Sequence, residues 1–101
     1  MALQVADILK ILKANYQKAV ELLPPDLAAE FQRKVIREED LKAYASSILV
    51  TIQLGNQTGM LRIQNWVADD FQRGGFAKKV VAKGLNPAQI YEQLLKGIYD
   101  Y

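Results

Sequence analysis

The sequence predicts an all-α fold, a single domain over residues 1–101 built as a bundle of five to six helices. Apolar residues recur every three or four positions, and alternation with period two is scarce, which is the pattern of helices rather than strands. Breaks are few, since the chain has three prolines and six glycines, and the glycines all lie in its second half. Half of the residues are hydrophobic and 24% are charged, so one core can form without disulfides or metal ions.

The first helix is predicted over about residues 4–23. Ile11 and Leu22 widen its apolar face, so we expect it to contact neighbours on more than one flank. Pro24 and Pro25 end it, because proline lacks the backbone donor and restricts the residue before it. The predicted buried stripe is Val5, Ile8, Leu9, Leu12, Tyr16, Ala19, Val20 and Leu23.

The second helix is predicted to begin at Pro25, where the missing N–H costs nothing, and Asp26 suits the positive end of its dipole. Extending the helical phase places Glu38 on the apolar stripe, which favours a bend there. The phase alone leaves open whether residues 25–54 form one bent helix or two. The stripe before the bend is Leu27, Ala28, Phe31, Val35 and Ile36.

Residues 41–54 are the most hydrophobic stretch and are predicted to be the central helix, ended by Gly55 in the left-handed conformation. Its small residues would let another helix approach closely; they are Ala43, Ala45, Ser46 and Ser47. Thr58 is the predicted N-cap of the next helix, over about residues 59–73, with Asp69 and Asp70 on its outer side. The inward residues of this helix are Met60, Ile63, Val67 and Phe71.

Two short helices are predicted at the end of the chain, over residues 76–83 and 87–99. Gly74 and Gly75 precede the first, and Asn86 caps the second, with Pro87 in its first turn and Gln89 placed to complete a capping box. They form a helical hairpin or a pair resembling a helix-turn-helix, in which Val80 and Ile90 take the buried positions.

The sequence lacks the residue types that several classes of function require. The chain has no cysteine and no histidine, which removes thiolate chemistry, the usual zinc ligands and the usual general base. Adjacent carboxylates such as Asp69 and Asp70 diverge on a helix and cannot act on one bond. We therefore predict no enzyme, with no catalytic, cofactor or metal site. Asp7 and Lys10 interrupt the first apolar run, and no run is long enough to cross a membrane, so we expect a cytoplasmic protein.

One stretch is basic. Residues 71–91 contain no acidic residue, although the net charge of the chain is only +2. The candidate residues for nucleic acid or an acidic partner are Arg73, Lys78, Lys79, Lys83 and Lys96. Most of them precede the last helix, which carries Glu92 and one lysine, so contacts to phosphates are expected rather than reading of base sequence.

The predicted function is a non-catalytic helical binding or assembly module, a small subunit of a larger complex or a homo-oligomer. The broad apolar faces of the first and central helices favour self-association or a protein partner, since a chain this small need not cover them internally. The alternative is a nucleic-acid-binding protein that uses segment 73–96. The candidate interface residues are Trp66, Tyr91, Tyr99 and Tyr101.

Overall fold

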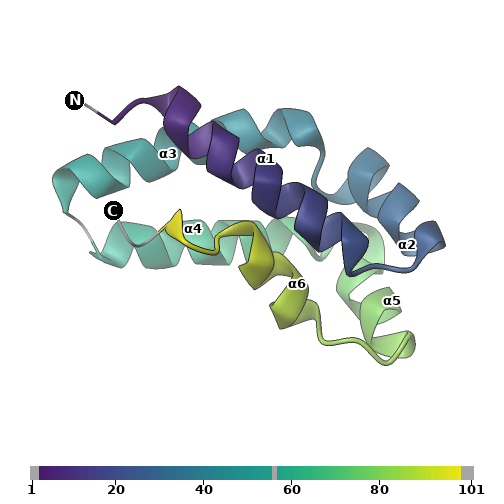
Figure 1. The fold of residues 1–101 in the computed structure, drawn as a ribbon. Coiled ribbons are helices and arrows are strands. Elements are labelled where there is room, and N and C mark those ends of the chain that lie inside the picture. Colours follow the sequence, from purple (N-terminus) through teal and green to yellow (C-terminus); the bar gives the residue numbers. More distant parts are fainter. Residues whose placement is uncertain (1–2, 56, 99–101) are drawn as a thin grey trace.

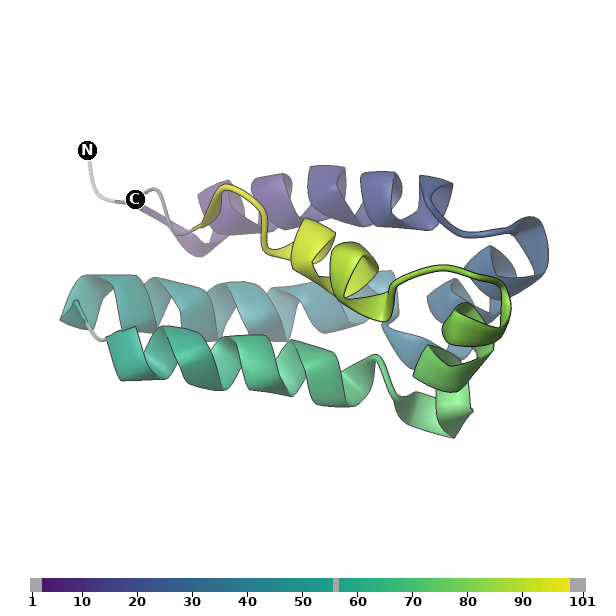
Figure 2. The same ribbon diagram turned by 90° about the horizontal axis from the view of Figure 1, so that it is seen from below.

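The computed structural model describes residues 3–55 and 57–98 and confirms the all-α bundle, with six α-helices and no strand in these ranges. The molecule is elongated, with principal extents of 43, 23 and 19 Å (Figure 1). Three long helices give it this shape: α1 (Val5–Glu21), α3 (Leu41–Leu54) and α4 (Gln57–Asp70). The short helices α2 (Pro25–Glu30) and α5 (Phe76–Ala82) lie at the end opposite the turn between α3 and α4. The short helix α6 (Pro87–Leu94) lies nearer the middle (Figure 2).

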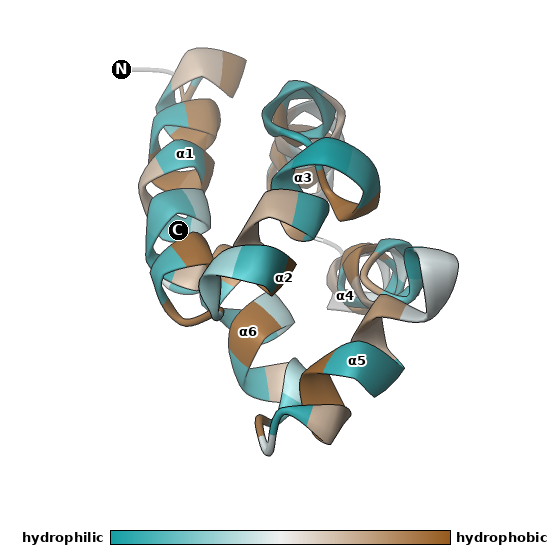
Figure 3. Ribbon diagram, turned by 90° about the vertical axis from the view of Figure 1, so that its right-hand side faces the viewer, coloured by the Kyte–Doolittle hydropathy of each residue, from teal (hydrophilic) through white to brown (hydrophobic). Residues whose placement is uncertain are grey.

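The core lies where the long helices meet the short ones. Helix α1 packs against both α3 and α6, and α3 and α4 form an antiparallel hairpin (Figures 1 and 3). Phe31 is central to a group of rings, at centroid distances of 5.4 Å from Tyr16, 5.9 Å from Phe71 and 5.8 Å from Phe76. All four rings are buried, so the clustered aromatic residues mainly hold the short helices against the long ones.

Helix α1 follows the prediction except at its end. The predicted residues Ile8, Leu12, Tyr16 and Ala19 are buried. Leu22 does not widen the buried face as expected, because it lies after the last helical turn and is 51% exposed.

Residues 25–54 form separate helices, which answers the question that the helical phase left open. Helix α2 continues into a π-helical turn at Phe31–Val35, and Ile36 is then extended before a 3-10 turn at Glu38–Asp40. The break is held by a hydrogen bond of 2.6 Å from the Tyr16 hydroxyl to the Ile36 carbonyl oxygen.

The α3–α4 hairpin confirms the predicted central helix and corrects the start of the next. Gly55 ends α3 with a φ of 62°, as predicted. Helix α4 begins at Gln57, so Thr58 lies inside its first turn and is not the N-cap. Of the small residues on α3, Ala45 is buried between helices, whereas Ala43 and Ser46 are exposed.

The end of the chain is shorter than predicted. Asn86 caps α6, accepting a hydrogen bond of 3.0 Å from the Ala88 amide. Helix α6 ends at Leu94 rather than near residue 99, and Gly97 follows in the left-handed conformation with a φ of 81°. Asn15 on α1 donates to the carbonyl oxygens of Leu94 and Lys96 at this end, at 3.0 and 2.9 Å. Val80 and Ile90 are buried, as predicted for the α5–α6 pair.

Candidate interaction surfaces

Arg73 joins three parts of the chain instead of standing free on the surface. Its guanidinium group donates to the Val35 carbonyl oxygen at 2.8 Å and to Asp70 at 3.0 Å. Asp40 lies 3.6 Å away on the other side. These contacts close the π-helical turn onto α4, so the charge of Arg73 is largely balanced by two carboxylates.

Asp70 is also more enclosed than predicted. It lies partly buried at the end of α4, where it accepts hydrogen bonds from Arg73 and from the hydroxyl group of Tyr44 on α3. The expectation that Asp70 lies on the outer side of the helix is therefore wrong, whereas Asp69 is exposed as expected. Burial, followed by the hydrogen bond to Asp70, raises the pKa of Tyr44, which keeps its hydroxyl group protonated as a donor.

Two lysines of the basic segment pair with helix α2. The Lys79 ammonium donates to both carboxylate oxygens of Glu30, at 3.0 and 2.8 Å. The Lys83 ammonium lies 3.4 Å from Asp26. The Leu27 backbone amide lowers the pKa of Asp26, and Lys83 adds to that effect. Water screens such exposed pairs, so they add little to stability, but they occupy charges that a polyanion would need.

The remaining two basic candidates lie apart. Lys78 is exposed on α5, and Lys96 follows α6 and lines a groove between α6 and α4. The structure therefore divides the five predicted basic residues among three settings rather than one continuous patch.

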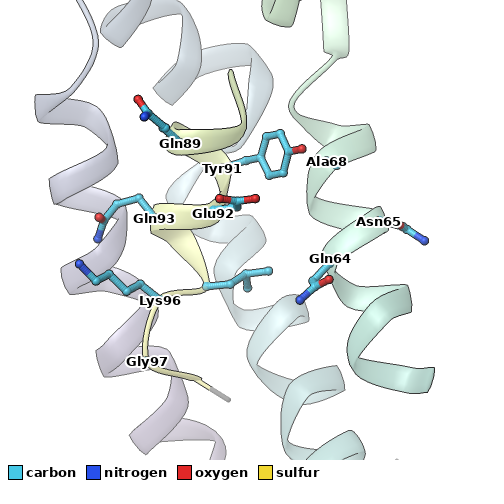
Figure 4. Close-up of a pocket in the computed structure, with 10 residues that line it drawn as sticks. Gln64, Asn65, Ala68, Gln89, Tyr91, Glu92, Gln93, Lys96 and Gly97 are labelled. Atoms are coloured by element: carbon cyan, nitrogen blue, oxygen red, sulfur yellow. The ribbon is translucent and has the colours of Figure 1, made fainter. Parts of the chain in front are cut away.

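This α4–α6 groove has a volume of about 570 Å³ and a mixed polar lining (Figure 4). Tyr91 points from α6 towards Ala68 on α4, and its ring packs against Phe71 at 5.6 Å. Gln93 projects towards α1, and its buried Nε2 atom has no hydrogen-bond partner among the residues that the structure describes. Two residues that line this groove, Tyr91 and Lys96, were predicted as binding residues from the sequence. The others that line it are Gln64, Asn65, Ala68, Gln89, Glu92, Gln93, Leu95 and Gly97.

Two of the four predicted interface aromatics, Trp66 and Tyr91, lie within the described residues, and they occupy different places on α4 and α6. Trp66 packs edge-on against Tyr44 of α3, with ring centroids 4.7 Å apart, and is 37% exposed. Tyr91 lines the α4–α6 groove, to which Trp66 does not contribute. Tyr99 and Tyr101 lie outside the described residues.

Three exposed apolar residues that were not among the predicted site residues flank the turn between α3 and α4. Val50 and Leu54, in the last turns of α3, are 54% and 71% exposed, and Leu61, near the start of α4, is 55% exposed. We call these three residues the hairpin end. The available signal was that Val50 and Leu54 are apolar yet lie on the opposite side of the helix from Leu41, Ala45 and Ile48.

The chain matches no family model, no curated protein and no solved structure. Within residues 3–55 and 57–98, no three His, Cys, Asp or Glu residues lie together as metal ligands would. In the same ranges, no helix has the length and apolar character needed to cross a membrane.

Proposed function

We propose that this chain is a non-catalytic helical module that acts by binding, through the hairpin end, to another protein surface. The observation that supports it is the exposure of Val50, Leu54 and Leu61 within twelve residues around one turn. Single exposed apolar side chains are common on protein surfaces, whereas larger groups of exposed apolar side chains mark sites of interaction. Covering an exposed valine or leucine contributes about 1–2 kcal/mol, so Val50, Leu54 and Leu61 would add to the affinity of a contact that covers them.

The titratable groups support a non-catalytic role. Tyr16 and Tyr44 have raised pKa values, and both are buried and committed to hydrogen bonds that join helices. Asp26 has a lowered pKa, but it is exposed at the start of α2 and paired with Lys83. Each perturbation has a structural cause, and none lies in the α4–α6 groove.

Nucleic-acid binding through segment 73–96 is the less favoured alternative. Counterion release requires cations that are free to meet phosphates, and Arg73, Lys79 and Lys83 already face carboxylates. Lys78 and Lys96 are exposed, but they lie on different elements.

The proposal is tested by affinity capture with three baits: the unchanged chain, a Leu54→Glu/Leu61→Glu variant, and a Leu22→Glu control at an exposed site away from the hairpin. We expect the unchanged chain and the control to retain the same protein, a second copy of the chain included, and the double variant to lose it. Equal retention by all three baits, or retention by none, would overturn the proposal.

A further inference from the structure

The side of α3 that faces away from the bundle carries an ordered row of residues. Ala43, Ser47, Val50 and Leu54 recur at spacings of four, three and four, so they lie along one face of the helix. We call this row the outer stripe. Ala43 is exposed, Ser47 is partly exposed, and Val50 and Leu54 are the two exposed apolar residues of α3 described above. Figure 3 shows α1 and α4 on two sides of α3, with its remaining side open.

When the outer stripe lies against the same stripe of a second copy running in the opposite direction, small side chains face large ones. Two small residues occupy its first half and two large residues its second half. A two-fold axis between Ser47 and Val50 would place Ala43 opposite Leu54 of a second copy, and Ser47 opposite Val50. Large side chains then fill the space above small ones, as interdigitating helices require. A two-fold interface needs a self-complementary patch of this kind.

The charges favour the same arrangement. Lys42 is the single charged residue in Leu41–Leu54, and the outer stripe has none, so pairing two stripes buries no unpaired charge. In an antiparallel pair the two Lys42 residues lie roughly 20 Å apart along the helix axis, whereas a parallel pair would place them side by side. Antiparallel helices also oppose their dipoles favourably.

We propose that the binding partner is a second copy of this chain, docked antiparallel along the outer stripe of α3. The dimer rests on the proposed binding function, for which it identifies the partner. A standard dimer covers about 800 Å² per partner, roughly one eighth of the 6167 Å² surface of this chain. One helix of about 21 Å supplies part of that area, and Trp66, exposed beside Tyr44 on the neighbouring helix, extends it. The interface is therefore at the small end of the range, which is typical of a weak, transient dimer.

Single-cysteine variants test the arrangement directly, because the natural chain has no cysteine to interfere. In the antiparallel pair the two copies of residue 47 are offset by about 4.5 Å along the axis, within disulfide reach. The two copies of residue 54 are offset by about 16 Å, beyond it. We expect Ser47→Cys to form a disulfide-linked dimer under mild oxidation, Leu54→Cys alone to form none, and a mixture of Ala43→Cys with Leu54→Cys to form the mixed dimer.

The matched control is Ala29→Cys, which places a thiol at an exposed position on α2, and circular dichroism confirms that each variant is folded. Cross-linking of Leu54→Cys alone as readily as Ser47→Cys, or cross-linking of Ser47→Cys no faster than the control, overturns the proposal. A chain that stays monomeric but captures a different protein through the hairpin end also overturns it, while the proposed binding function survives. Failure of both the cross-linking and the capture overturns both.

Discussion

The Tyr44 hydroxyl group donates a hydrogen bond to Asp70, which ties the central helix α3 to the far end of α4. The tyrosine is fully buried, and the carboxylate is held in turn by Arg73. This link keeps the two helices of the hairpin in register, so the hairpin end is presented on a braced pair of helices.

Tyr44→Phe should destabilise the fold by about 1–2 kcal/mol, because it removes one hydrogen bond to a charged group and leaves a partly buried carboxylate with one donor fewer. Urea unfolding measures the change. Tyr91→Phe is the matched control, since Tyr91 is only partly buried in the α4–α6 groove. Equal stability of the Tyr44 variant and the natural chain would show that the link contributes nothing.

Asn15→Ala should cost about 2 kcal/mol, because the buried amide of Asn15 donates to two carbonyl oxygens after the last turn of α6. Asn65→Ala, at an exposed position on α4, should have little effect. Hydrogen exchange at the amides around Leu95 should quicken in the Asn15 variant alone. Unchanged exchange there would mean that these hydrogen bonds do not hold the end of α6.

Stability should fall at high pH. Burial, with smaller contributions from Glu38 and Asp40, raises the pKa of Tyr16 from 10.0 to about 12. Because the pKa is higher in the folded state, the protonated hydroxyl group contributes stability that is fully present below pH 10. This contribution, at most about 3 kcal/mol, is lost as the pH rises from 10 to about 12. Unfolding measured across this range should be less pH-dependent in Tyr16→Phe than in the natural chain. Parallel curves for the two proteins would contradict this assignment.

The basic segment should bind nucleic acid weakly. Because Lys79 and Lys83 face Glu30 and Asp26, a Lys78→Gln/Lys79→Gln/Lys83→Gln variant should resemble a Lys10→Gln/Lys13→Gln/Lys18→Gln control on α1 in retardation assays at low salt. Binding that weakens steeply with added salt and disappears only in the first variant would favour the nucleic-acid alternative instead.

Local signals predicted most of the helix boundaries. Gly55 ends α3 and Asn86 starts α6, because a left-handed glycine and a capping side chain act within a few residues. Contacts between distant residues could not be predicted in this way. Asn15 bonds to the end of α6 from about eighty residues away, and the Lys79–Glu30 pair joins helices that neither sequence neighbourhood reveals.

The candidate sites were harder to predict than the fold for the same reason. Five basic residues near one another in the sequence lie in three settings, because α5 turns two of them towards α2. The exposure of Val50 and Leu54 depends on which sides of α3 the helices α1 and α4 cover, and a helical wheel of one segment does not contain that information.

Light scattering after size-exclusion chromatography tests the central claim most directly. Across the micromolar range, we expect the molar mass of the natural chain to rise from 11.4 kDa towards twice that value. Leu54→Glu should remain at the monomer mass, and the control Leu22→Glu, at an exposed site away from the hairpin, should behave like the natural chain. A mass of 11.4 kDa at every concentration, or a rise that Leu54→Glu leaves unchanged, would contradict association through the hairpin end.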